Sequence, residues 1–342
     1  MSGTRKGTDD NLEYAQRWLA RAIKDFDAFK KLAIFDKKTH DTIRCSDPAL
    51  AVYLLQQSVE KAVKAVAIAS GQYTVEELKG KYGHNSLALI LNLYRKSVAQ
   101  IKLLGLGPIV DLMGVDLENG VLKLTDLENK AFGRKPVLVV EGDKMESMRA
   151  ESIRISPKVI DQILDMVIQL RSLFLHGVRS AFIHLPELGI RKGHGTVEDP
   201  EAFIGALSYK MAADLKAPSL SEAQLKAILD LNKVTSTSSI QSSSGIKRSS
   251  MINAQLGIWS LSIALIFLTY FTFGHEHTSR YPRELVSADK KKMAKLGCED
   301  YDNNLGIVNR LGRLAYVTSL TLNDIKKEPE SIAFLFAKKS VS

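Results

Sequence analysis

Hydrophobic residues recur every three or four positions along several long stretches of this chain. The spacing is most regular in residues 49–71, where apolar side chains alternate with glutamine, glutamate and lysine. The same pattern predicts amphipathic helices over residues 11–33, from about His84 onward and over 305–322. Long amphipathic helices joined by short polar connections are typical of an antiparallel bundle, so we expect an all-α fold.

Capping residues predict both ends of the helix over 49–71. Asp47 precedes Pro48, which is the order expected for an N-cap followed by the first helical residue. Gly71 is expected to end the helix, because glycine readily adopts the conformation that follows a helix C-terminus. Residues 1–10 are polar and are expected to form a disordered tail.

A long segment of different character, residues 101–250, follows the third predicted helix. It ends in the Ser-rich run VTSTSSIQSSSGIKRSS, which is typical of a linker. The β-branched run at 135–142 is the best strand candidate of the chain. The remaining elements are predicted to be helices over 121–132, 157–172, 199–215 and 219–232. We interpret the segment as a mainly helical insertion or subdomain.

Residues 254–273 contain no charged side chain, and this allows two interpretations. Their length suits a transmembrane helix, with Lys247 and Arg248 as a basic flank. The chain would then be a membrane-attached interaction protein. The stretch also carries glutamine, serine, threonine and tyrosine, which lower its hydropathy, so we favour a helix buried in the bundle core.

Composition narrows the cellular setting and the class of partner. The chain has a formal net charge of +9, which either attracts an acidic partner such as RNA, DNA, a nucleotide or an anionic lipid, or only aids solubility. Its two cysteines, Cys45 and Cys298, argue against a disulfide framework, and no Cys/His spacing suggests zinc. The N-terminus lacks a secretory signal, so we expect a cytoplasmic protein. We expect no metal and no cofactor.

Two sequence strings resemble one known family. They are QQ-x-x-EK-x-x-KA at residues 56–65, followed by the Gly83–His84 pair, and S-R-Y-P at 279–282. Together they resemble the HEPN domain, the higher-eukaryote and prokaryote nucleotide-binding helical bundle. The resemblance covers roughly residues 11–100 and 250–322. It implies an antiparallel bundle of four or five helices, with a large insertion between helices three and four.

The resemblance also implies a domain organisation and a biological role. The expected division is a disordered tail (1–10), bundle helices one to three (11–100), an insertion or helical subdomain (101–250), bundle helices four and five (251–325) and a C-terminal tail (326–342). The implied role is nucleotide or RNA binding in a prokaryotic defence, stress or toxin–antitoxin system. The implied partners are a second copy, forming a homodimer through helix four, and a protein such as a nucleotidyltransferase-type antitoxin.

The candidate binding residues follow from the same two regions. Arg280 offers fixed donors to a phosphate, Tyr281 can stack on a base, and the neighbouring histidines can pair with an anion. The full candidate set is Arg280, Tyr281, His275, His277, Lys61, Lys64 and His84. An alternative reading makes Arg280 and the histidines a helix terminus with favourable cations, and the lysines a solvated helix face.

A second functional class is a metal-independent endoribonuclease. HEPN nucleases generally carry R-x4–6-H, and Arg171–His176 and Arg179–His184 match that spacing. Both matches fall in the insertion, and about one match is expected by chance in a chain of this composition. His277 with Arg280 is the other candidate catalytic pair, although no arginine precedes His277 at the required distance.

Overall fold

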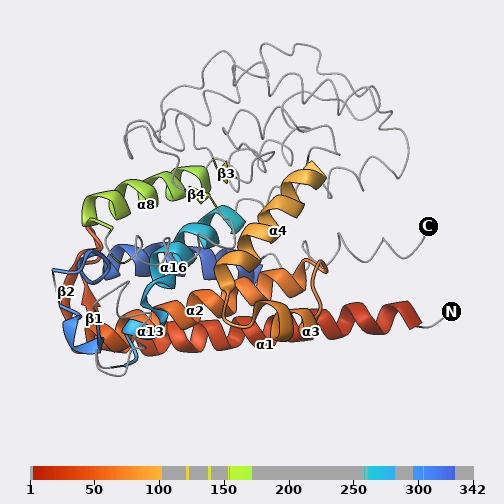
Figure 1. Cartoon of the computed structure of the whole chain (residues 1–342), viewed down its shortest axis with the longest axis horizontal. Helices are drawn as coiled ribbons and strands as arrows, with labels where there is room; N and C mark the ends of the chain where they lie inside the picture. Colours follow the sequence, from red (N-terminus) through yellow and green to blue (C-terminus); the bar gives the residue numbers. More distant parts are fainter. Residues whose placement is uncertain are drawn as a thin grey trace, which may run out of the picture.

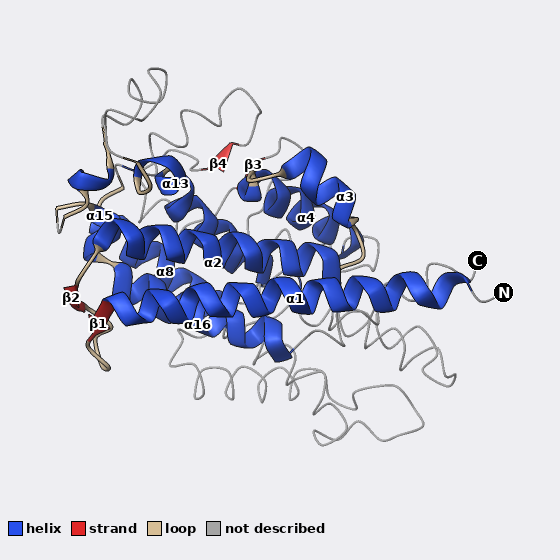
Figure 2. Cartoon of the chain, turned by 90° about the horizontal axis from the view of Figure 1, so that it is seen from below, coloured by secondary structure: helices blue, strands red, loops and turns tan. Residues whose placement is uncertain are grey.

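The computed structural model describes residues 3–101, 121–122, 138–139, 153, 155–171, 258, 261–281, 296–302 and 304–327. This part of the chain is mostly helical, as expected, and its strands form two short two-stranded sheets. Helices α1 (Gly3–Leu32) and α2 (Pro48–Ala69) run antiparallel along one side of the bundle. Helix α4 (Ser86–Ile101) packs on α2, α16 (Leu311–Lys327) packs on both α1 and α2, and α8 (Pro157–Arg171) packs on α16 (Figure 1 and Figure 2).

Helix α1 begins eight residues earlier than the sequence pattern predicts. It starts at Gly3, so the predicted disordered tail over 1–10 is wrong for residues 3–10. The reason is that each residue added to an existing helix gains a hydrogen bond without a new nucleation cost. The apolar periodicity that starts near Leu12 therefore indicates where α1 packs, and the helix itself extends further.

The predicted caps of α2 are confirmed. The side chain of Asp47 accepts a hydrogen bond from the backbone N–H of Leu50, and Pro48 occupies the first helical turn. After the helix ends at Ala69, Gly71 takes a positive φ of 64°, which a residue with a Cβ rarely adopts. These caps fix the ends of a helix in which most residues are buried.

The connection from α1 to α2 contains a hairpin that the sequence analysis missed. Strand β1 (Ala33–Phe35) pairs antiparallel with β2 (Thr42–Cys45), with Ala33 opposite Cys45. The turn between the strands is closed by Asp36, whose carboxylate accepts the backbone N–H groups of Lys38 and Thr39. This Asx-type turn gives a polar stretch a defined structure.

Part of the segment 101–250 belongs to the bundle. Helix α8 is confirmed close to its predicted bounds, and Ile160, Ile163 and Val167 lie in the same hydrophobic core as α1 and α2. Strands β3 (Val121–Leu122) and β4 (Leu138–Val139) pair antiparallel, so β4 confirms the strand candidate, whereas the helix predicted from Val121 is wrong at its start. The predicted helices over 199–215 and 219–232 lie outside the described residues.

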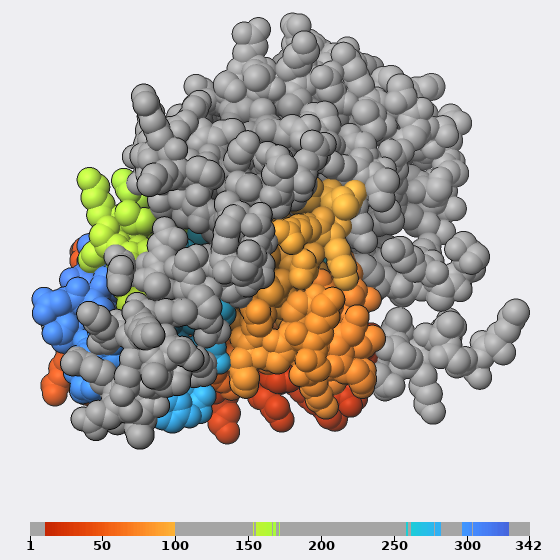
Figure 3. Space-filling view, viewed as in Figure 1, coloured from red at the N-terminus to blue at the C-terminus, as the bar shows by residue number. Residues whose placement is uncertain are grey.

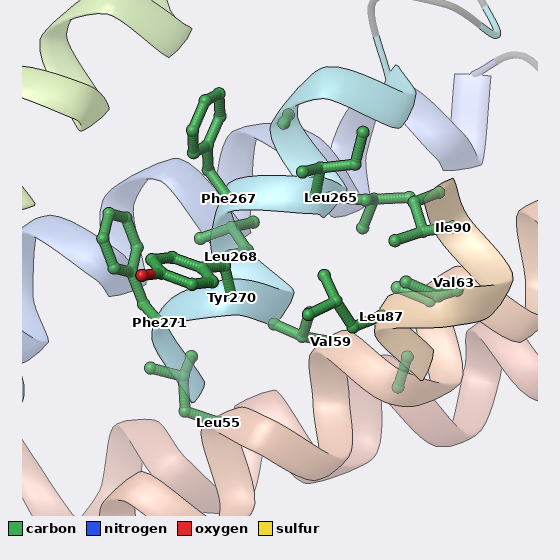
Figure 4. Packing of buried hydrophobic residues seen from close by; sticks show 14 of the residues in the cluster. Leu55, Val59, Val63, Leu87, Ile90, Leu265, Phe267, Leu268, Tyr270 and Phe271 are labelled. Atoms are coloured by element: carbon green, nitrogen blue, oxygen red, sulfur yellow. The ribbon is translucent and has the colours of Figure 1, made fainter. Parts of the chain in front are cut away.

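Residues 261–273 form a helix inside the core. Leu265, Leu268 and Phe271 are at most 1% exposed and face Leu55 of α2 and Ile90 of α4 (Figure 4). This is the packing that the buried-helix interpretation expects for these residues. No helix among the described residues is long and apolar enough to cross a membrane.

Several short elements complete the described chain. Helix α3 (Val75–Glu77) and the π-helical turn η1 (Leu78–Tyr82) lead into α4. Helix α13 (His275–Thr278) continues the buried helix toward the surface and contacts α2. The 3-10 turn η6 (Cys298–Asp300) and α15 (Gly306–Asn309) precede α16. The space-filling view shows the segment around 275–281 reaching the surface beside residues of α1 and α2 (Figure 3).

Candidate functional site

A stripe of polar residues runs along the face of α2 that meets the 275–281 segment. Tyr53, Gln56, Glu60 and Lys64 follow one another at intervals of three or four, which places them on one side of the helix. Arg280 contacts Tyr53, and Glu276 lies 4.0 Å from Nδ1 of His84, which also contacts Glu60. The 275–281 segment therefore runs antiparallel to the stripe.

Glu60 is the centre of a buried hydrogen-bond network. Glu60 is 3% exposed. Its Oε1 accepts a hydrogen bond from Nζ of Lys64 at 2.7 Å and lies 3.2 Å from Nδ1 of His84. Its Oε2 accepts from Nε2 of Gln56 at 3.1 Å. A buried acidic side chain needs hydrogen-bonding partners, and these three contacts supply them within the bundle.

His84 connects this network to the surface. Gly83 adopts a φ of 48° and a ψ of −110°, a conformation available to glycine, and this turn directs the chain toward Glu60. Asn85 then caps α4 by accepting the backbone N–H of Ala88. The His84 side chain remains 69% exposed, while its Nδ1 lies 3.2 Å from Glu60 and 4.0 Å from Oε1 of Glu276.

Arg280 lies at the other end of the stripe and is exposed. Its guanidinium carbon is 5.1 Å from the ring centre of Tyr53 and 5.4 Å from that of Tyr281, within the range of cation–π attraction. Four other arginines donate to carboxylates: Arg17, Arg171, Arg310 and Arg313. Arg280 makes no such pair among the described residues.

His275 does not belong to this surface, and its predicted role in anion binding is wrong. The side chain is fully buried, and its Nδ1 lies 2.7 Å from the hydroxyl of Tyr301. Burial lowers the pKa of His275 to about 3, so the imidazole is neutral at neutral pH. A neutral, enclosed ring cannot attract a dissolved anion, and His275 has a structural role in the core instead.

The two lysines predicted for the site are both held by the bundle. Lys61 pairs with Asp25 of α1, which turns it away from the stripe. Lys64 is 7% exposed, pairs with Glu60 and lies over the ring of Trp18. Lys64 therefore supports the site from within, whereas Lys61 connects α1 to α2.

Of the residues predicted for RNA cleavage, Arg171 is held in an ion pair within the bundle. Arg171 donates two hydrogen bonds to the carboxylate of Asp324, and its side chain is 14% exposed. This bidentate pair joins α8 to α16 and uses the donors that catalysis would need. His176, Arg179, His184 and the side chain of His277 lie outside the described residues.

Sequence reasoning missed Glu60, Glu276 and Tyr53 as site residues. Charged residues on a helix are normally solvated, and a tyrosine among apolar helix residues is normally packed in the core. One signal was present, because Glu60 and Lys64 stand four positions apart within a helix that is otherwise mostly apolar. Because this helix packs into the core, Glu60 and Lys64 are buried together with the helix face that carries them.

A separate hollow of about 260 Å³ lies between α1, α2 and the end of α16. Its lining is mostly alanine, leucine and isoleucine, including Leu19, Ile23 and Ile325, and none of the stripe residues takes part. Among the described residues, no group of three or more His, Cys, Asp or Glu side chains is arranged to hold a metal ion.

Searches of protein-family models, of curated proteins and of solved structures find no match to this chain.

Proposed function

We propose that this chain is a helical-bundle module that binds single-stranded RNA or a nucleotide. The observation that carries the proposal is the exposed residue Arg280, whose guanidinium lies near the rings of Tyr53 and Tyr281. The planar guanidinium fork matches the geometry of a phosphate group, and tyrosine faces stack on bases of any sequence. The net charge of +9 adds a long-range attraction for a polyanion.

A HEPN-like identity is part of the same proposal. The two strings that resemble the family are 56–65 and 279–282, and both supply residues to the site. Glu60 and Lys64 come from the first string, while Arg280 and Tyr281 come from the second. The homodimer, the defence or toxin–antitoxin role and the antitoxin partner remain proposals that rest on this resemblance.

Binding to a labelled single-stranded RNA, measured by fluorescence anisotropy at low salt with EDTA, tests the function. We expect Arg280→Ala to weaken binding about tenfold or more, because a hydrogen bond to a charged group contributes about 1.5–3 kcal/mol. The slope of log affinity against log salt should fall by about 0.7, the value for one lost phosphate contact on a single strand.

Arg44→Ala is the matched control, because Arg44 is also exposed but lies on β2 outside the site. It removes the same charge and should change affinity much less than Arg280→Ala. Equal losses of RNA affinity in both variants would show that binding is general electrostatic attraction without a defined site. If the wild-type protein binds no RNA, the proposed function is refuted. The same reactions reveal any metal-independent cleavage, which would make the chain an endoribonuclease.

A further inference from the structure

The two ends of the polar stripe differ in the ligand groups that they favour. At one end, Arg280 presents positive charge beside two tyrosines. At the other, Nδ1 of His84 lies 3.2 Å from the carboxylate of Glu60, which pairs with Lys64, and 4.0 Å from the carboxylate of Glu276. A phosphate is attracted to the first end, whereas the second favours a neutral hydrogen-bond donor.

The hydrogen bond at Nδ1 determines what His84 offers to a ligand. A carboxylate only accepts hydrogen bonds, so the contact of Nδ1 with Glu60 places the proton of the neutral ring on Nδ1. Nε2 is then an acceptor. It has no partner among the described residues, and the side chain is 69% exposed. His84 thus presents a fixed acceptor to solvent beside the stripe.

The spacing of the two ends fits a nucleic-acid strand. Tyr53 and Glu60 are seven residues apart on α2, which is about 10 Å along a helix axis. A stacked strand rises about 3.4 Å per nucleotide, so this distance corresponds to about three nucleotides. A strand that is held by a phosphate at Arg280 and runs beside α2 would place a sugar at the level of His84 about three nucleotides away.

We propose that His84 accepts a hydrogen bond from a ribose 2′-hydroxyl, and that this contact makes the site prefer RNA to DNA. The 2′-hydroxyl is the donor that DNA lacks, and it is neutral, which suits an acceptor beside two carboxylates. Glu60 is a positioning residue, because it acts by fixing the tautomer of His84. This inference rests on the proposed nucleic-acid binding and adds the residue that selects the sugar.

Three strands of one base sequence test the proposal: RNA, DNA and 2′-O-methyl RNA. Wild-type protein should bind RNA about five- to tenfold more tightly than either of the others, the effect of one hydrogen bond. The 2′-O-methyl strand keeps RNA-like geometry but lacks the donor, so it separates hydroxyl recognition from recognition of shape. In His84→Ala the ratio of RNA to DNA affinity should fall to about one, the value expected without the contact.

A second measurement examines the tautomer without any ligand. The ¹⁵N chemical shifts of His84, at a pH where the ring is neutral, should report the Nδ1-protonated form. Glu60→Gln should shift the population toward the Nε2-protonated form and reduce the preference for RNA. A circular dichroism spectrum and a melting curve for each variant identify any loss of folding.

The outcomes separate this inference from the proposed function. Equal affinity of wild type for RNA and DNA, or an unchanged ratio in His84→Ala, would overturn the role of His84 while leaving nucleic-acid binding intact. Tight binding of the 2′-O-methyl strand would overturn it too, because shape would then explain the preference. If no strand binds, the proposed function itself fails. An Nε2-protonated ring in the wild type would contradict the role given to Glu60.

Discussion

The hydroxyl of Tyr301 lies 2.7 Å from Nδ1 of His275 at a point where both residues are buried. Burial raises the pKa of the Tyr301 hydroxyl and lowers that of His275 to about 3. The tyrosine hydroxyl also lies 2.7 Å from Oγ1 of Thr278. His275 belongs to α13 and Tyr301 follows η6, so their contact joins these two parts of the chain. Both side chains are neutral where they meet.

His275 should make folding stability decrease in mild acid. The unfolded chain takes up a proton on this histidine as pH falls through 6.5, its ordinary pKa, whereas the folded protein does not until about pH 3. The folding stability that the neutral ring contributes is therefore complete above pH 6.5. It is lost as the pH falls from 6.5 to 3, at up to about 1.4 kcal/mol per pH unit. His275→Gln should show a shallower slope in urea unfolding between pH 5 and 7.

Tyr301→Phe provides the matched variant for this measurement. It removes the hydroxyl but leaves the imidazole buried, so stability should fall by about 1–3 kcal/mol while the steep pH dependence remains. Identical slopes in wild type and His275→Gln would show that the acid sensitivity arises from other groups.

Arg171→Ala should destabilise the bundle without affecting RNA binding. The substitution leaves the carboxylate of Asp324, which is 8% exposed, without its bidentate partner. We expect the free energy of unfolding to fall by about 3 kcal/mol, the typical cost of breaking a buried ion pair from one side. Chemical denaturation and the anisotropy assay measure the two properties on the same sample.

A neutral replacement of both partners, Arg171→Met with Asp324→Asn, should recover part of that stability because no unpaired charge remains. Normal stability of Arg171→Ala together with lost RNA cleavage would instead return Arg171 to the catalytic role that its spacing to His176 suggests.

The helices were predictable because their signals are local. Asp47, Pro48 and Gly71 mark the ends of α2 within its own sequence, and the apolar period marks the faces of α1 and α16. The packing of α8 was not predictable in this way. Its connection to α16 depends on Arg171 and Asp324, which are 153 residues apart, and no local pattern encodes that distance.

The site was partly predictable for a related reason. Arg280 and Tyr281 follow a long apolar helix, where exposure is expected, and the structure agrees. His275 stands only five positions earlier but is fully buried. Sequence gives residue type and spacing, whereas burial depends on which elements pack over a residue. This is why His275 was assigned to the wrong environment and Glu60 was overlooked.

Gly312→Ala should loosen the contact between α16 and the β1–β2 hairpin. A Cβ at this position would overlap the carbonyl oxygen of His40 and press on the ring of Phe35. The backbone N–H of Gly312 also donates to the hydroxyl of Thr42, so the approach is close on both sides. We expect a loss of about 1–3 kcal/mol in thermal or urea unfolding, as for overpacking of a core. Stability equal to wild type would show that the hairpin moves aside freely.

Gly83→Ala connects the fold directly to the proposed site. The φ of 48° at Gly83 is strained for any residue with a Cβ, so the substitution should cost about 1–3 kcal/mol of folding stability even though space for a methyl group exists. Because Gly83 directs His84 toward Glu60, relief of the strain should also displace the ring and lower the preference for RNA over DNA.

Gly80→Ala is the matched control for this prediction. Gly80 has equal space but no positive φ, so the substitution should leave stability and RNA preference near those of wild type. Unchanged preference in a destabilised Gly83→Ala would mean that His84 reaches its position without the turn.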